Sequence, residues 1–120
     1  EALRAFVDMG ILIALDDFGT DYSCMQYLKR LPIGKLKIAM PFVRGITVDS
    51  KDEAVINSML VLAEQMKLRI LAEGVELESQ LQFLCAAKCY EIQGYYFSKP
   101  LPAEEISNLL LSQSVFAVKC

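Results

Sequence analysis

The fold of this 120-residue chain is decided by ILIALDDFG, the stretch at residues 11–19. Its first five residues, 11–15, form a continuous apolar run that Gly10 precedes and Asp16 follows. Such a run is typical of a strand buried on both faces of a parallel sheet, because helices cover both sides of such sheets. The sequence therefore predicts a fully buried strand over residues 11–15 that ends at two adjacent carboxylates, Asp16 and Asp17.

Further strands and helices alternate along the chain after that stretch. Apolar patterns predict strands at residues 36–38, 69–72 and 90–92, and helices at residues 22–30, 53–66, 77–87 and 103–111. This alternation predicts an α/β fold with about four parallel strands. A closed (β/α) barrel of eight strands takes roughly 200 residues or more. If the strands belong to a barrel, the chain therefore holds about half of one.

Composition excludes several classes of partner and location. The chain carries 12 Lys and Arg against 15 Asp and Glu, so its net charge of -3 gives no electrostatic reason to expect nucleic acid or an anionic membrane as partner. Its apolar runs are too short to span a bilayer, so we expect no membrane segment in this chain. No secretion signal is recognisable, and we expect a cytoplasmic domain, although missing domains of a parent protein could anchor it to a membrane.

The histidine and cysteine content of the chain excludes several kinds of catalytic and metal site. The chain has no His, which excludes a Ser-His-Asp triad, a Cys-His pair and a zinc site of the His-Glu-x-x-His kind. The four cysteines are expected to be reduced thiols, since nothing marks the chain for an oxidising compartment. Catalysis would therefore have to use carboxylates, lysine and metal ions.

Carboxylates stand at the ends of two predicted strands, Asp16-Asp17 at the first and Glu73 at the third, each with a glycine close behind. The carboxyl ends of parallel strands are where α/β enzymes carry their active sites. Together with Glu76, these side chains would form an oxygen-rich cluster suited to Mg²⁺ or Mn²⁺. Adjacent residues of a regular strand point to opposite faces, but a strand end that runs into a glycine turn can direct both aspartates to one site. The alternative is that the pair only ends the strand and caps the turn.

Lys37 lies between Leu36 and Ile38 in an otherwise apolar predicted strand. A lysine in that setting is costly unless its ammonium group reaches carboxylates or substrate oxygens. A lysine whose ammonium group reaches carboxylates or substrate oxygens would support a site at the ends of the strands. The alternative is a lysine at a strand end that extends its ammonium group into solvent.

Five ordered blocks, spanning nearly the whole chain, resemble the EAL-domain phosphodiesterases. They are IALDDFGTDYS at residues 13–23, YLKRLPI at 27–33, LKI at 36–38, AEGVE at 72–76 and QGYYFSKP at 93–100. The resemblance implies a modified TIM-like (β/α) barrel that hydrolyses cyclic di-GMP to linear pGpG with two divalent metals, Mg²⁺ or Mn²⁺. It also implies that residues 1–120 are a partial EAL domain, its C-terminal half, with the N-terminal half and its metal ligands absent.

The resemblance assigns roles to seven positions. Metal binding is assigned to Asp16, Asp17 and Glu73. Catalysis is assigned to Glu73, as metal ligand or general base, and to Lys37, which would hold the attacking water or a phosphate oxygen. Roles in substrate binding or in supporting the site are assigned to Glu76, Gln93 and Pro100, the last where the family packs a guanine.

The sequence departs from the family pattern at three positions. Ala39 stands where the family usually has an aspartate two residues after the lysine, which removes a site carboxylate. Asp21 and Cys24 replace a glycine and a serine in the loop after the metal ligands, a loop that helps to form the dimer contact in the family. We therefore expect a cyclic di-GMP phosphodiesterase domain that is inactive as this fragment. The alternative, motivated by Ala39, is a degenerate EAL module that acts as a cyclic di-GMP receptor or a protein-interaction regulator.

A half barrel leaves two open sheet edges and, by expectation, an apolar inner face, which monomers rarely tolerate. The sequence therefore predicts a homo-oligomer, for example two halves that pair into one barrel. In a parent protein, the resemblance also implies an upstream sensory or GGDEF-type domain.

Overall fold

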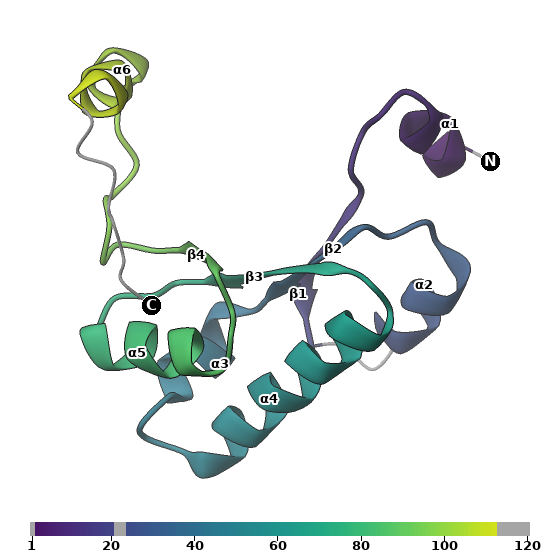
Figure 1. Cartoon of the computed structure of the whole chain (residues 1–120), viewed down its shortest axis with the longest axis horizontal. Coiled ribbons are helices and arrows are strands. Elements are labelled where there is room, and N and C mark those ends of the chain that lie inside the picture. The colour runs from purple at the N-terminus through teal and green to yellow at the C-terminus, as the bar shows by residue number, and fades with distance from the viewer. Residues whose placement is uncertain (1, 21–23, 113–120) are drawn as a thin grey trace.

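The described part of the chain forms a four-stranded sheet in which every neighbouring pair is parallel (Figure 1). The structure is a computed structural model that describes residues 2–20 and 24–112. In sheet order its strands are β1 (Ala14–Phe18), β2 (Lys35–Ile38), β3 (Arg69–Glu73) and β4 (Glu91–Gln93). The helices are α1 (Ala2–Asp8), α2 (Cys24–Arg30), α3 (Met40–Gly45), α4 (Ser50–Gln65), α5 (Glu78–Ala86) and α6 (Ala103–Leu111). The predicted alternation of strands and helices is confirmed.

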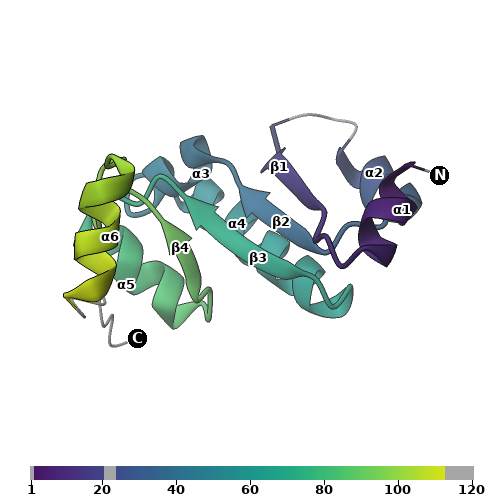
Figure 2. The same cartoon turned by 90° about the horizontal axis from the view of Figure 1, so that it is seen from above.

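One face of the sheet carries the hydrophobic core. Helices α3, α4 and α5 lie together on that face (Figures 1 and 2). Leu36 and Ile38 of β2 and Ala72 of β3 are fully buried there, in one cluster with Ile56 of α4 and Leu84 of α5. Burying a side chain of leucine or isoleucine size contributes about 1.5–3 kcal/mol, so this cluster holds the strand ends in a fixed arrangement.

The opposite face of the sheet is polar, and the predicted apolar inner face is wrong. Strand residues alternate between faces, and the register pairs Lys35 with Arg69, Lys37 with Leu71, and Glu73 with Gln93. From β2, β3 and β4, the side chains on this face are therefore those of Lys35, Lys37, Arg69, Leu71, Glu73, Glu91 and Gln93. Among the described residues no helix lies over the middle of this face, and α1 and α6 stand at its two ends (Figures 1 and 2).

Strand β1 differs from its prediction in position and in burial. It begins at Ala14 and includes both aspartates, whereas the predicted strand covered residues 11–15. Ile11 and Leu12 are nearly half exposed, so the prediction of a strand buried on both faces is wrong. The reason is that β1 lies at a sheet edge and, within the described part of the chain, pairs only with β2. An apolar run indicates where a strand is favoured but does not supply the neighbours that would cover it.

The remaining elements differ from their predictions mainly at the ends. Helix α6 has the predicted bounds, whereas α4 begins at Ser50, three residues early, because Asp49 caps its polar first turn. Helix α3 was not predicted, since its six residues are too few to show helical periodicity. None of the helices in the described part of the chain has the length and hydrophobicity that a membrane span requires.

The cysteines follow their prediction in part. Cys89 is a free, fully buried thiol, and burial raises its pKa to about 11, which keeps it protonated and unreactive. Cys85 is disulfide-bonded, so the prediction of four reduced thiols is wrong at that position. The side chain of Cys24 and the whole of Cys120 lie outside the described residues.

Candidate functional site

A bulge at the end of β1 directs its two aspartates. Between Leu15 and Phe18 the strand advances three residues while β2 advances two, so Asp16 and Asp17 occupy an irregular position. Asp17 adopts a left-handed backbone with φ of 49°, which aspartate tolerates better than most residues. Its backbone N–H donates to Asp16 Oδ1 at 2.9 Å. The strand end thus directs both carboxyl groups to one site, as the glycine turn behind them predicts.

Glu73 joins these aspartates from β3. Carboxylate oxygens of Asp16, Asp17 and Glu73 all lie within 4.8 Å of one another, and this group is here called the carboxylate cluster. The hydrophobic core beneath the sheet fixes β1 and β3 in register with β2, which lies between them. Residues more than fifty positions apart in the sequence therefore meet at the carboxyl ends of neighbouring strands.

Lys37 connects the two sides of the carboxylate cluster. Its Nζ lies 3.0 Å from Asp16 Oδ1 and 2.6 Å from Glu73 Oε1. The lysine between two buried apolar residues therefore reaches carboxylates, as predicted, and the alternative of an ammonium group in open solvent is wrong. Only 24% of its side chain and 18% of that of Glu73 are exposed, so this ion pair is less screened than that of an ordinary surface lysine.

The ion pairs set the protonation of this group. The hydrogen bond from Lys37 is the main cause that lowers the pKa of Asp16, against an opposing effect of burial. The hydrogen bond to Glu73 is the main cause that raises the pKa of Lys37. At neutral pH Asp16 is therefore ionised and Lys37 is protonated. Three carboxyl groups face one ammonium group, and oxygen-rich groups of this kind suit hard divalent cations such as Mg²⁺ and Mn²⁺.

Glu76 lies outside the carboxylate cluster. Gly74, with φ of +79°, turns the chain after Glu73, and Glu76 Oε1 accepts a hydrogen bond from Arg44 Nη2 of α3 at 3.2 Å. The expectation that Glu76 adds its oxygens to the metal cluster is therefore wrong for this structure. Its observed partner is the guanidinium group of Arg44.

The other predicted positions lie around this group. Gln93 pairs with Glu73 across β3 and β4, and its backbone oxygen accepts from the N–H groups of Gly74 and Val75 at 2.8 and 3.2 Å. Pro100 lies exposed in the segment between β4 and α6, outside the carboxylate cluster. Ala39 is fully buried at the start of α3, directly after β2, and its methyl group offers no oxygen to the site.

Gln80, a buried polar residue that holds the backbone after Glu73, was not predicted from the sequence. It is buried, with 3% exposure, and its Oε1 accepts hydrogen bonds from the backbone N–H groups of Glu76 and Leu77 at 2.8 and 3.0 Å. Glutamine three residues after an N-cap is half of a capping-box pattern, which was the available signal. Arg44 was also missed, and no pattern in the sequence points to its contact with Glu76.

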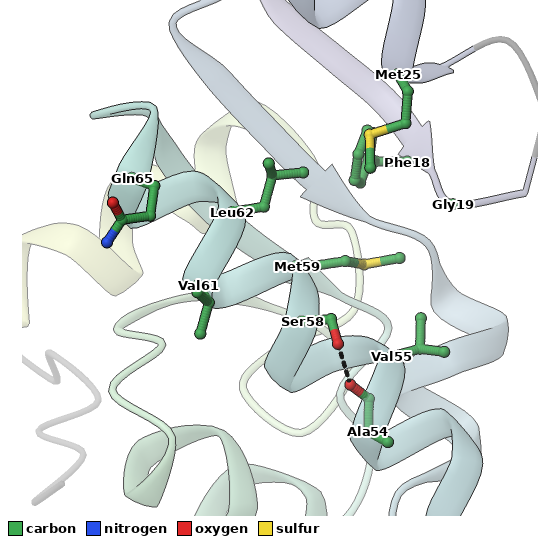
Figure 3. Close-up of a pocket in the computed structure, with 10 residues that line it drawn as sticks. All are labelled: Phe18, Gly19, Met25, Ala54, Val55, Ser58, Met59, Val61, Leu62 and Gln65. Atoms are coloured by element: carbon green, nitrogen blue, oxygen red, sulfur yellow. Dashed lines mark hydrogen bonds between the residues drawn. The ribbon is translucent and has the colours of Figure 1, made fainter.

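An apolar cavity of about 630 Å³ lies beside the strand end that carries the aspartates (Figure 3). Phe18 and Gly19 of that strand end form one wall, and residues of α4 form another, with Met59 pointing toward Gly19 (Figure 3). Ser58, one of its few polar side chains, donates to the backbone oxygen of Ala54 at 2.8 Å. The described residues that line the cavity include no carboxylate or lysine, so the candidate chemistry of the described residues belongs to the carboxylate cluster.

Comparison with known proteins identifies one family. The sequence model of the EAL domain matches residues 1–100. The chain is 44% identical over 98 residues to the bifunctional diguanylate cyclase/cyclic di-GMP phosphodiesterase MucR of Pseudomonas aeruginosa, covering 82% of this chain and 14% of that protein.

Solved structures agree with that match. The EAL domain of Mycobacterium smegmatis DcpA superposes with a TM-score of 0.88 at 36% identity, covering 92% of this chain and 50% of that one. A manganese and cyclic di-GMP complex of Klebsiella pneumoniae BlrP1 superposes with a TM-score of 0.77 at 31% identity, covering 82% of this chain and 25% of that one. The chain thus spans at most half the length of these proteins.

Proposed function

Because the chain belongs to the EAL domain family, we propose that it forms the C-terminal half of a cyclic di-GMP phosphodiesterase domain and is inactive by itself. EAL domains have a TIM-barrel fold, and the four parallel strands are the part of that barrel held by this chain. The proposed reaction is hydrolysis of cyclic di-GMP to linear pGpG.

The observation that carries this proposal is the convergence of Asp16, Asp17 and Glu73 around the ammonium group of Lys37. Isolated acidic residues are common on protein surfaces, but here two strand ends deliver carboxylates to one side of a lysine. The fit to a metal is a matter of donor chemistry, because carboxylate oxygens are the ligands that Mg²⁺ and Mn²⁺ prefer.

The four residues of the site would have different roles in the proposed reaction. Asp16, Asp17 and Glu73 would hold divalent cations, and Glu73 could instead take a proton as general base. The chemistry that such cations supply when bound is neutralisation of the phosphodiester and activation of the attacking water. Lys37 remains protonated, so its ammonium group would donate to a phosphate oxygen or hold the water in place.

Gln93, Glu76 and Pro100 would support the site, each from a different position. The backbone of Gln93 already anchors the turn after Glu73. Glu76 would order the loop through Arg44. The exposed Pro100 would pack against a guanine of the substrate.

Inactivity of the isolated chain follows from the share of the domain that it holds. The chain covers half of the solved DcpA EAL domain, and the family resemblance assigns further metal ligands to the other half. An incomplete ligand shell weakens metal binding without abolishing it, and it loses most of the stabilisation of the transition state. An assay of this chain with Mn²⁺ and cyclic di-GMP is expected to give no turnover, and ordinary turnover would contradict the proposal.

A chimera tests the proposed activity. Residues 1–100 of this chain would replace the matching segment of the phosphodiesterase domain of MucR. We expect hydrolysis that depends on Mn²⁺ and is lost in the Glu73→Gln variant. A folded chimera that binds cyclic di-GMP but does not hydrolyse it would contradict the catalytic role.

The second candidate function is a degenerate EAL module that serves as a cyclic di-GMP receptor or a protein-interaction regulator. The observation that favours it is Ala39, a buried methyl group at a position where the family usually carries an aspartate. The same chimera separates the two functions, because a receptor would bind cyclic di-GMP tightly without hydrolysing it.

The unpaired edges of the sheet support the proposal that the isolated chain self-associates. Within the described residues β1 and β4 each pair with a single strand, which leaves backbone groups on their outer sides for another chain. Helices α1 and α6 bury no side chains, and apolar residues on both are exposed, among them Val7 and Leu110. Light scattering of dilute protein should report a homo-oligomer, and a stable monomer would contradict this.

The parent protein is proposed to be cytoplasmic at this domain and to carry an upstream sensory or diguanylate cyclase domain. MucR is named as a bifunctional diguanylate cyclase/cyclic di-GMP phosphodiesterase, and the matched region is only 14% of its length. Sequencing the coding region upstream of residue 1 tests this, since a different type of preceding segment would contradict it.

A further inference from the structure

The segment from Gly74 to Leu77 joins β3 to α5 and follows Glu73 directly. Its four successive backbone N–H groups reach only two acceptor atoms. The N–H groups of Gly74 and Val75 donate to the backbone oxygen of Gln93 at 2.8 and 3.2 Å. Those of Glu76 and Leu77 donate to Gln80 Oε1 at 2.8 and 3.0 Å. One half of the segment is therefore held by the sheet, and the other half is held by a single side chain.

The position of that side chain is fixed by packing. Gln80 lies in the first turn of α5 and is 3% exposed, the one polar side chain that is buried in the described part of the chain. Leu81 and Leu84 of the same helix are buried in the core beneath the sheet. Water has little access to Gln80, so loss of its oxygen would leave two N–H groups without a ready replacement.

The chemistry of the amide also suits the location. A neutral amide oxygen accepts two hydrogen bonds without adding a negative charge next to Glu76 and the carboxylate cluster. Glu76 is held at its other end by the guanidinium group of Arg44. The backbone of this residue is thus anchored by Gln80 and its side chain is anchored by α3.

We propose that Gln80 is a positioning residue for the carboxylate cluster, acting through the segment from Gly74 to Leu77 on Glu73. This rests on the proposed metal-dependent function. Glu73 immediately precedes the anchored segment, so motion of the segment displaces the carboxylate that faces Asp16 and Lys37. Residues that orient metal ligands from outside the ligand shell commonly change metal affinity by about 10–100-fold when they are replaced.

A helix cap with no further role predicts a different result. Loss of a cap lowers the stability of the helix by about 0.5–2 kcal/mol but leaves the metal affinity of the folded protein unchanged. The two roles are separated by measuring metal affinity where every variant remains folded. Local amide exchange then reports whether the segment itself has been released.

The test compares three variants of this chain. Gln80→Met keeps the length of the side chain and removes the acceptor. Gln80→Asn keeps the amide, but its shorter side chain moves the oxygen away from the two N–H groups. This variant replaces Gln80→Met if the methionine variant does not fold. The matched control is Gln82→Met, the same change in the same helix at an exposed glutamine whose amide contacts Glu78 at 3.4 Å.

Two readouts decide the proposal. In Gln80→Met, amide exchange should accelerate at Glu76 and Leu77 but not at Gly74 and Val75, and the affinity for Mn²⁺ should fall about 10-fold. Gln82→Met should change neither quantity. Unchanged exchange at Glu76 and Leu77, or a loss of Mn²⁺ affinity no larger than in the control, would overturn the proposal. If the wild-type chain binds no Mn²⁺, the proposed metal site fails, and exchange at the two amides alone decides whether Gln80 anchors the segment.

Discussion

Lys37 and Glu73 form an ion pair between neighbouring parallel strands, with 2.6 Å between Nζ and Oε1. A second interstrand pair, Lys35 with Glu91, lies on the same face at the opposite ends of the strands. At the carboxyl ends the ammonium group of Lys37 faces more carboxyl groups than it can neutralise. At the amino ends Glu91 is paired with two cations, Lys35 and Arg69. The carboxylate cluster around Lys37 is therefore suited to binding a cation, whereas the ion pairs of Glu91 hold the strands together.

The pairing at the amino ends predicts how stability depends on acid. The hydrogen bond from Arg69 is the main cause that lowers the pKa of Glu91 below its ordinary value of 4.5, with Lys35 contributing. A lowered folded-state pKa contributes stability above the unfolded value, and that contribution is lost as pH falls through the folded value. In Glu91→Gln the free energy of unfolding should therefore be lower at neutral pH by under about 1 kcal/mol, since these groups are partly exposed.

Denaturant titrations from pH 7 to below pH 4 measure this effect. The difference between wild type and Glu91→Gln should shrink as the solution becomes more acidic. Glu104→Gln, on the exposed helix α6, is the control and should behave as wild type. Parallel pH profiles for wild type and Glu91→Gln would show that the ion pairs contribute nothing.

The turn that carries the site depends on a close backbone contact at Gly94. A Cβ atom there would overlap the backbone carbonyl oxygen of Val75, which cannot rotate away. Gly94→Ala should lower the free energy of unfolding by about 1–3 kcal/mol or more, since the backbone must shift. The shift should also accelerate amide exchange at Gly74, because its acceptor belongs to Gln93.

Gly34→Ala is the matched substitution for that experiment. A Cβ at Gly34 meets mainly the side chain of Leu12, which is nearly half exposed and free to rotate. In the same denaturant titration, Gly34→Ala should lower the free energy of unfolding less than Gly94→Ala does. Equal losses in the two variants would show that the contact with Val75 is not tight.

Ala39 is the position at which the family pattern predicts a gain of activity. In the MucR chimera, Ala39→Asp should raise cyclic di-GMP hydrolysis about 10-fold, as expected for restoring a supporting carboxylate near metal ligands. Ala39→Asn is the control, because Ala39 is the N-cap of α3 and either Asp or Asn can cap a helix. Equal rates for the two variants would assign any gain to helix capping rather than to the carboxylate.

The sequence was sufficient to predict the carboxylate cluster because its signals are local. Asp16, Asp17 and Glu73 each follow an apolar run, and parallel strands bring their carboxyl ends together by topology. Lys37 could be predicted for the same reason, since a lysine flanked by buried apolar residues requires a polar partner. The structure confirms these contacts, whereas their roles in catalysis stay predictions.

The features that could not be predicted depend on long-range contacts. The exposure of Ile11 and Leu12 follows from the place of β1 at a sheet edge, which no local pattern reports. The charge on the face opposite the core depends on the register of β2, β3 and β4, because the register decides which alternating side chains share a face. The contacts of Gln80 required knowing that the first turn of α5 is buried against the core, which no local pattern reports.

Calorimetric titration of Mn²⁺ into this chain tests the central claim, that the carboxylate cluster is a metal site, most directly. Asp17→Asn is the informative variant, because Asp17 forms no ion pair within the described residues and its loss leaves Lys37 paired with Glu73. Asp8→Asn, the same change at an exposed aspartate of α1 outside the cluster, is the control. We predict binding by the wild type and by Asp8→Asn, and loss of most of the affinity in Asp17→Asn. Equal affinity in Asp17→Asn and wild type, or no binding by any of the three proteins, would contradict the assignment.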